Sequence, residues 1–195
     1  MVVDDAASRV QVIMASLPGL LYRVSTPAGA GLEPHVRVEG MSVRAGLRAT
    51  GTDGPHEVRI VLNRDVRWGI RLPAGAGEQQ LDLARGRVTR VDLGASGLIE
   101  LRLPEPVGTV PVTLAGGVGT LSVTMPAGAP LRIGLDQGAG SATTPWTVAE
   151  SLPAGTYLGP AIWPAARHRY ALRAIDGIGF LTVRRSTTQS GKPRA

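Results

Sequence analysis

The chain contains no cysteine, so neither a disulfide framework nor a thiolate metal site can form. Aromatic residues make up only 4% of its 195 residues, and a core therefore has to be built from aliphatic side chains. No run of about 20 apolar residues occurs, which excludes a transmembrane helix. The N-terminus carries Asp4 and Asp5 where a secretory signal would have a basic region. We therefore expect a cytoplasmic protein with no membrane span.

Lysine is almost absent as well, since Lys192 is the single lysine and arginine supplies nearly all of the positive charge behind the net charge of +6. A basic chain can bind nucleic acid or an anionic surface. The arginines are scattered, however, and several alternate with apolar residues, as in Val58-Arg59-Ile60, which is typical of the solvated face of a strand. The shortage of aromatic residues that could stack on bases also disfavours nucleic acid as a partner.

What the sequence has in abundance is a repeat of apolar pairs. The two members of a pair are separated by one residue, and glycine, alanine, serine or proline follows, as expected for a strand that ends in a tight turn. The first members of successive pairs lie 11, 10, 10, 11, 11 and 10 residues apart. Such a fixed step indicates a stack of like units. The pairs are Ile70/Leu72, Leu81/Leu83, Val91/Leu93, Leu101/Leu103, Val112/Leu114, Val123/Met125 and Ile133/Leu135.

Two such units make a coil of about 21 residues, and the match is best between the segments that begin at Val91, Val112 and Ile133. We predict an all-β fold, a parallel β-helix (β-solenoid), in which equivalent pairs of successive coils lie above one another. This stacking would bury the apolar face of every strand, at roughly 1.5–3 kcal/mol for each side chain. The alternative is a β-sandwich of short hairpins, which also places strands at this spacing.

A short helix is expected over residues 5–16, as a cap on the solenoid. Asp5 can serve as its N-cap, and Val10 and Met14 then fall on one face. The alternation of Val10 and Val12 also fits a strand, but we favour the helix.

The predicted organisation has three parts. Residues 1–57 form the N-terminal cap and the first strands. Residues 58–185 form the solenoid, in which the aromatic and proline-rich segment 143–166 is a loop insertion. Residues 186–195 are polar and form a disordered tail.

Several segments of the repeat carry a resemblance to a known group of domains. They include Trp68-Gly69-Ile70-Arg71-Leu72, Val91-Asp92-Leu93-Gly94, Pro126-Ala127-Gly128, Gly138-Ala139-Gly140 and Gly177-Ile178-Gly179-Phe180-Leu181-Thr182-Val183. From roughly Val58 to Val183, the chain resembles the β-solenoid domains of bacterial envelope proteins: adhesin-like, toast-rack or cell-wall-active antibiotic response (LiaF-like) domains of the actinobacterial type. The resemblance implies a right-handed β-helix and a non-enzymatic role in envelope stress sensing or as a scaffold.

The chemistry-bearing residues form no familiar motif. His35, His56 and His168 do not have the spacing of zinc ligands. The sequence also lacks a Gly-x-Ser-x-Gly elbow, a phosphate-binding loop and the acidic repeat of calcium-binding rolls. We therefore expect no metal and no cofactor.

The aromatic residues are unevenly distributed, because four of the seven lie between Trp146 and Tyr170. They could seal the end of the solenoid, since terminal coils need caps. They could instead line a pocket for an apolar small molecule, with an indole N–H or a phenol orienting a carbonyl group. The candidate ligand-binding residues are Trp68, Trp146, Tyr157, Trp163, Tyr170 and His168.

Two functional hypotheses follow. The first is a non-catalytic β-solenoid scaffold or interaction domain linked to cell-envelope stress. The second is a cofactor-free, pericyclase-like cyclase or isomerase that preorganises an apolar polyketide-type small molecule of secondary metabolism. An enclosed apolar cavity at the candidate tryptophans would favour the enzyme, and a solid core would favour the scaffold. With both ends covered, we expect a monomer or a small closed homo-oligomer.

Overall fold

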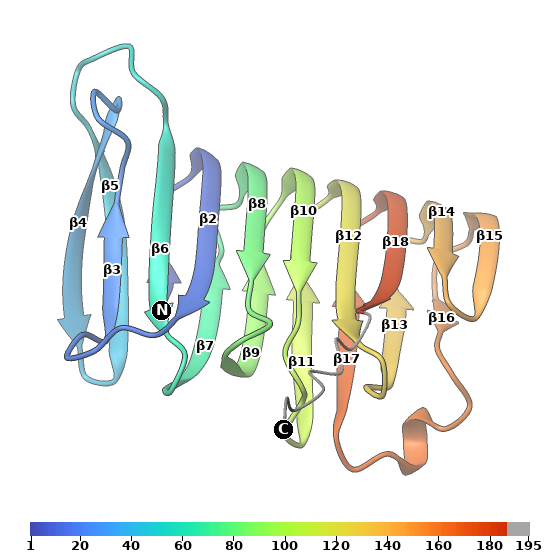
Figure 1. Ribbon diagram of the computed structural model, residues 1–195. Helices are drawn as coiled ribbons and strands as arrows, with labels where there is room; N and C mark the ends of the chain where they lie inside the picture. The colour runs from blue at the N-terminus through green and yellow to red at the C-terminus, as the bar shows by residue number, and fades with distance from the viewer. Residues whose placement is uncertain (187–195) are drawn as a thin grey trace, which may run out of the picture.

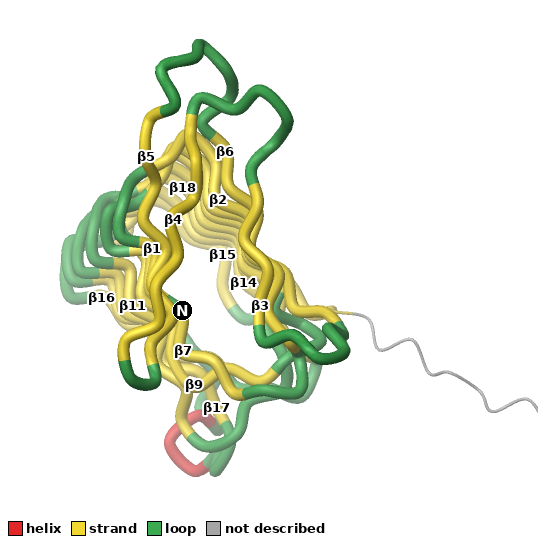
Figure 2. The backbone as a smooth tube through the Cα atoms, turned by 90° about the vertical axis from the view of Figure 1, so that its left-hand side faces the viewer, coloured by secondary structure: helices red, strands yellow, loops and turns green. Residues whose placement is uncertain are grey.

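The computed structural model describes residues 1–186 and consists of two β-sheets of nine strands each, which face one another (Figures 1 and 2). In spatial order, sheet A contains β16 (Thr156–Leu158), β13 (Leu131–Leu135), β17 (Arg169–Ala174), β11 (Thr109–Leu114), β9 (Arg87–Leu93), β7 (Arg67–Leu72), β1 (Val2–Val3), β5 (Ser42–Ala49) and β4 (Leu32–Glu39). Sheet B contains β15 (Thr147–Leu152), β14 (Ala139–Thr144), β18 (Ile178–Ser186), β12 (Val118–Pro126), β10 (Ser96–Arg102), β8 (Ala76–Asp82), β2 (Ala7–Ala15), β6 (Glu57–Asn63) and β3 (Tyr22–Ser25).

From β5 to β14 the chain alternates between the sheets, so that one strand of each makes a coil. Neighbouring coils pair in parallel, and Val91 lies between Ile70 and Val112, each 21 residues away along the chain. The all-β prediction is confirmed, and this winding is consistent with the predicted solenoid. Antiparallel pairs, which a sandwich of hairpins would need throughout, occur at the two ends.

Aliphatic side chains fill the space between the sheets. Residues at alternate positions of each strand point inward and stack on their equivalents in the next coil, and Ile70, Val91 and Val112 are fully buried. A single coil has nothing to cover its apolar face, so each one depends on its neighbours for burial.

A ladder of glycines runs across sheet B, where the strands begin. Its members are Gly77, Gly97, Gly119, Gly179 and Gly140, on the adjacent strands β8, β10, β12, β18 and β14. A Cβ atom on Gly119 would lie 2.6 Å from the carbonyl oxygen of Gly97, and one on Gly179 would lie 2.5 Å from that of Gly119. Only glycine lets successive coils approach this closely.

The predicted N-terminal helix is wrong, because residues 7–15 form strand β2 and residues 1–186 contain no α-helix. Val10, Val12 and Met14 point into the core and are at most 2% exposed. β2 pairs in parallel with β6 on one side and β8 on the other. The segment forms a strand and not a helix because the strand places all three apolar side chains in the core, between those of β6 and β8.

Both ends of the chain are interleaved into the stack. The N-terminal coil, β1 and β2, lies between the coils β5–β6 and β7–β8. The C-terminal coil, β17 and β18, lies between β11–β12 and β13–β14 (Figure 1). Ile133 consequently pairs with Leu172 and not with Val112, so the direct stacking expected from the 21-residue repeat is wrong at this step.

Antiparallel strands close both ends of the sheets. β3 and β4 cover one end, and β15 and β16 cover the other. β15, β16 and a single 3-10 turn, η1 (Trp163–Ala165), lie within the segment 143–166, for which a loop was expected. Residues 187–195, nearly all of the predicted tail, lie outside the described part of the chain. Within residues 1–186, no helix is long and apolar enough to cross a membrane.

The glycine ladder gives a stability prediction. Gly119→Ala should lower the free energy of unfolding by about 1–3 kcal/mol, because the new methyl group overlaps a backbone oxygen that cannot move aside freely. Gly128→Ala is the matched control: no atom lies within 4 Å of a Cβ built there, and the change should stay within about 0.5 kcal/mol. Urea unfolding followed by circular dichroism measures both, and equal effects would contradict the close approach of the coils.

Candidate functional site

The structure separates the six candidate residues into three places. Trp68 lies on β7, in the N-terminal half of the stack, where its indole N–H donates to the carbonyl of Asn63 at 2.9 Å. Trp146 lies in the turn from β14 to β15 of sheet B. The other four lie at the opposite end of sheet A: Tyr157 on β16, Trp163 in η1, His168 in the loop before β17, and Tyr170 on β17.

Two arginines that are not among the candidate residues surround Trp163. The guanidinium carbons of Arg132 and Arg169 lie 3.9 and 4.2 Å from the centroid of the indole ring. The ring is 7% exposed, and its N–H donates to the carbonyl of Tyr170 at 2.6 Å. Trp163 is thereby anchored to β17, and it holds Arg132 of the next strand, β13, by a cation–π contact.

The two guanidinium groups differ in their hydrogen bonds. Arg169 donates to the hydroxyl of Thr109 and to the carbonyls of Trp163 and Pro164, at 2.7–3.0 Å, so most of its donors are used. Arg132 is exposed and has no acceptor within hydrogen-bonding distance among residues 1–186; its contacts are with the rings of Trp163 and Tyr157. A planar group with five N–H donors is therefore held in place and left available.

Tyr157 forms an aromatic platform beside Arg132. Its side chain lies over Gly134 of the neighbouring strand: a Cβ on that glycine would come within 3.0 Å of the ring. The residue is 69% exposed, so part of the ring faces solvent. The centroid of the ring lies 5.6 Å from the guanidinium carbon of Arg132.

Arg132, Tyr157 and Trp163 line a depression of about 170 Å³, together with Pro160 and Ala161. It opens to solvent on the outer face of sheet A. The larger depression that Trp68 lines, of about 560 Å³, is open as well. Neither has the enclosed form that a cyclase acting by shape would need.

Tyr170 and His168 make structural hydrogen bonds. The phenol of Tyr170 is fully buried and donates to the carbonyl of Pro104 at 2.8 Å, so it points away from the depression. Burial, and to a lesser degree the charge of Glu105, raises the pKa of Tyr170. The imidazole Nδ1 of His168 accepts the backbone N–H of Gly108 at 2.9 Å.

Trp146 packs at a corner of sheet B. The guanidinium carbon of Arg185 lies 5.7 Å from the centroid of its ring, and the Nη1 atom of Arg185 donates to the carbonyls of Pro126 and Ala129. Burial lowers the pKa of this arginine. The indole nitrogen of Trp146 is buried and has no hydrogen-bond partner among the described residues. These contacts belong to the β14–β15 corner and do not reach the depression on sheet A.

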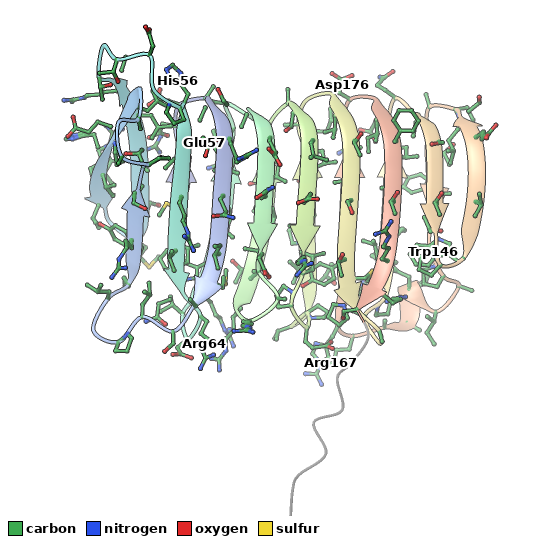
Figure 3. The ribbon with its side chains drawn as sticks, turned by 45° about the horizontal axis from the view of Figure 1, so that its top comes forward. His56, Glu57, Arg64, Trp146, Arg167 and Asp176 are labelled. Carbon is green, nitrogen blue, oxygen red and sulfur yellow. The ribbon has the colours of Figure 1, made fainter. Side chains whose placement is uncertain are left out.

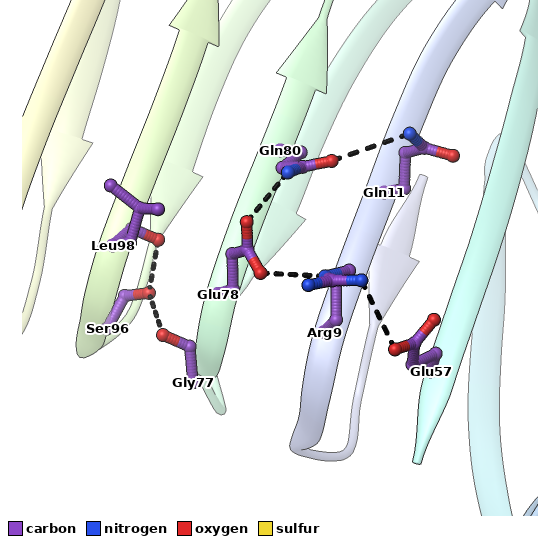
Figure 4. Close-up of polar contacts among 8 residues, drawn as sticks. All are labelled: Arg9, Gln11, Glu57, Gly77, Glu78, Gln80, Ser96 and Leu98. Atoms are coloured by element: carbon purple, nitrogen blue, oxygen red, sulfur yellow. Dashed lines mark hydrogen bonds and ion pairs between the residues drawn. The ribbon is translucent and has the colours of Figure 1, made fainter. Parts of the chain in front are cut away.

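The outer face of sheet B carries polar side chains that satisfy one another (Figure 4). Arg9 bridges Glu78 at 2.7 Å and Glu57 at 3.3 Å, and Glu78 also accepts from the amide of Gln80. Gln11 continues the row to Gln80. Since these donors and acceptors are paired within the sheet, this face offers a ligand less than Arg132 does.

The environment of Tyr170 predicts a pH dependence. An unfolded tyrosine has a pKa near 10, and in the folded protein it is higher. Below about pH 10 both states keep the proton, so this group makes no contribution to the pH dependence. Above about pH 10 the unfolded chain loses its proton first, and the free energy of unfolding falls as the pH rises.

Tyr170→Phe should flatten this alkaline fall and cost about 1–3 kcal/mol at neutral pH, because the buried carbonyl of Pro104 loses its donor. The exposed Tyr157→Phe should change neither. Urea unfolding at a series of pH values measures both quantities, and an unchanged alkaline slope in Tyr170→Phe would contradict the assignment.

The fold also occurs in a solved structure. The crystal structure of a "putative cell adhesion protein" from Clostridium sporogenes matches with a TM-score of 0.69 and 16% identity, over 95% of this chain and 91% of that chain. No protein-family model matches the sequence, and no curated protein matches it significantly. At this identity the match shows a shared fold, and it agrees with the adhesin-like part of the resemblance noted in the sequence.

Proposed function

We propose that the protein is a non-catalytic β-solenoid interaction domain of the adhesin-like kind, which binds a carboxylate-bearing partner through Arg132. The observation that carries this proposal is the guanidinium of Arg132, which stacks on Trp163 and has its donors free at an open depression. The fold shared with a protein described as a cell adhesion protein supports an interaction role.

The residues around the depression favour binding over catalysis. Its lining contains no carboxylate, imidazole, hydroxymethyl or thiol group; the phenol of Tyr157 is its one group besides Arg132 that could exchange a proton, and no base lines the depression to activate it. The apolar ladders fill the interior, and Tyr170 and His168 are engaged in hydrogen bonds of their own. The cyclase hypothesis has no observation in its favour among the described residues.

The chemistry of Arg132 selects a planar anion. A guanidinium matches a carboxylate through two parallel N–H···O bonds, and stacking on an indole fixes the plane of the fork in advance. Tyr157 and Pro160 add apolar surface beside it. A carboxylate attached to a ring with an apolar C–H face, such as that of an acidic sugar, fits both parts of the site.

The capped ends of both sheets support the expected monomer or small closed oligomer, because the edge strands β3, β15 and β16 are short and the longer edge strand β4 contains Pro34, which makes them poor templates for further pairing. A role in envelope stress and the toast-rack or LiaF-like relationship stay predictions from the sequence. The same holds for the cytoplasmic location.

The test is binding to an acidic polysaccharide. Titration with polygalacturonate, with its neutral methyl ester as the comparison ligand, should show binding of the acid form alone. Arg132→Gln should weaken this binding roughly tenfold or more, because a charge-assisted hydrogen bond is worth about 1.5–3 kcal/mol.

Arg59→Gln is the matched control, since this exposed arginine of sheet B also has no ion pair among residues 1–186 and its loss changes the net charge equally. It should weaken binding less than twofold. If both variants weakened polygalacturonate binding equally, the binding would depend on the net charge alone, and a specific site at Arg132 would be refuted.

A further inference from the structure

Exposed apolar side chains gather at one corner of the N-terminal end. Leu20 and Leu21 lie in the turn between β2 and β3 and are 48% and 44% exposed. Met41, in the turn between β4 and β5, is fully exposed, and Val38 beside it is 63% exposed. Both turns lie at the lower left of the ribbon in Figure 1. Leu21, Val38 and Met41 line a single depression, so the two turns form one patch.

Arginines surround this patch. The same depression, of about 560 Å³, is lined by Arg44, Arg67, Arg71 and Arg90. Arg44 pairs with Asp4 and with Glu39, and Asp92 is shared between Arg71 and Arg90, so three carboxylates face these four arginines. No carboxylate in the described part of the chain pairs with Arg67. The rim therefore keeps a net positive charge around an apolar floor.

The lower edge of the molecule extends this positive charge. Arg64 and Arg167, which are labelled in Figure 3, both lie along it. Arg85 lies in the turn before β9, and Arg87 is the first residue of that strand. The turns of the opposite edge carry Asp53 and Asp176 and contain no arginine or lysine. The lower turns also carry Asp65, which pairs with Arg64, and Glu105, so their three arginines exceed their two acids by one, whereas the turns of the opposite edge are acidic.

We propose that this corner docks on the surface of an anionic lipid bilayer. Met41, Leu20 and Leu21 would enter the headgroup region, with Arg67 and its neighbours facing lipid phosphates. Apolar side chains on projecting turns and a cationic rim are the two contributions that bind proteins at a membrane surface. A partner protein or a second copy would need a concave surface complementary to two protruding turns. A lipid bilayer is fluid and can accommodate them without such a surface.

The proposal is independent of the Arg132 site. The patch lies at the β4–β5 end of sheet A and Arg132 lies on β13, near the opposite end. Seven strand spacings of about 4.8 Å separate β4 from β13, or about 34 Å across the sheet.

The test is co-sedimentation of the chain with vesicles of phosphatidylcholine, made with and without phosphatidylglycerol. Binding is expected to the anionic vesicles only and to weaken as salt is added. The double variant Leu20→Ser and Met41→Ser should reduce binding at least tenfold, and Arg67→Gln should reduce it severalfold. Leu20 and Met41 both lie in exposed turns, so the double variant should keep the fold.

Two variants serve as matched controls. Val148→Ser removes an apolar side chain that is 78% exposed at the other end of the stack, and Arg132→Gln removes an arginine there. Neither should change vesicle binding by more than twofold, so a failure of the carboxylate site would not be mistaken for a failure of this one.

Three results would overturn the proposal. One is the absence of binding to anionic vesicles. Another is vesicle binding that the double serine variant leaves intact, which would be adsorption by charge alone. The third is a dimer in solution that the double serine variant dissociates, without any vesicle binding, which would make a second copy the occupant of the patch.

Discussion

The in-register stacking of aliphatic side chains from coil to coil is the interaction on which the rest of the structure depends. Each coil presents an apolar face that it cannot cover alone, and the parallel pairing of sheets A and B places the equivalent faces of the next coil against it. Close approach is needed for this burial, and the glycine ladder of sheet B permits it. Because the ladders fill the interior, binding is left to the outer faces, the turns and the two ends. The Arg132 site and the apolar corner both lie there.

The ends of the chain make the stack a closed unit. In a simple solenoid the first and last coils would be terminal, but here β1–β2 and β17–β18 each lie one coil inside their end, between strands that come from other parts of the sequence. The terminal positions are taken by β3, β4, β15 and β16, which pair antiparallel and are followed by turns rather than by further coils. The interleaved coils connect the end coils to the middle, because each pairs with an end coil on one side and with a middle coil on the other.

The sequence revealed the stacked apolar pairs but not the spatial order of the coils that carry them. The step from Val91 to Val112 was predicted correctly, since nothing lies between those strands. The step to Ile133 was not, because Leu172 carries the same alternating pattern and a pattern does not state which strand is its neighbour. For residues 5–16, Val10 and Met14 fit both periods and Val12 fits only that of a strand; β6 and β8 on either side stabilise the strand. Arg132 looked like an ordinary arginine on a solvated strand face; its role depends on η1, which returns Trp163 to β13 from later in the chain.

The interleaving of the C-terminal coil can be tested directly by disulfide cross-linking, since the chain has no cysteine of its own. Ser122 of β12 lies opposite Thr182 of β18, which in turn lies opposite Thr143 of β14. Adjacent strands are about 4.8 Å apart, within the reach of a disulfide, and strands two apart are beyond it. Oxidation should therefore cross-link the variant with cysteine at positions 122 and 182 and leave the variant with cysteine at 122 and 143 unlinked. A cross-link in the second variant and none in the first would show the uninterrupted 21-residue stack and contradict the interleaved one.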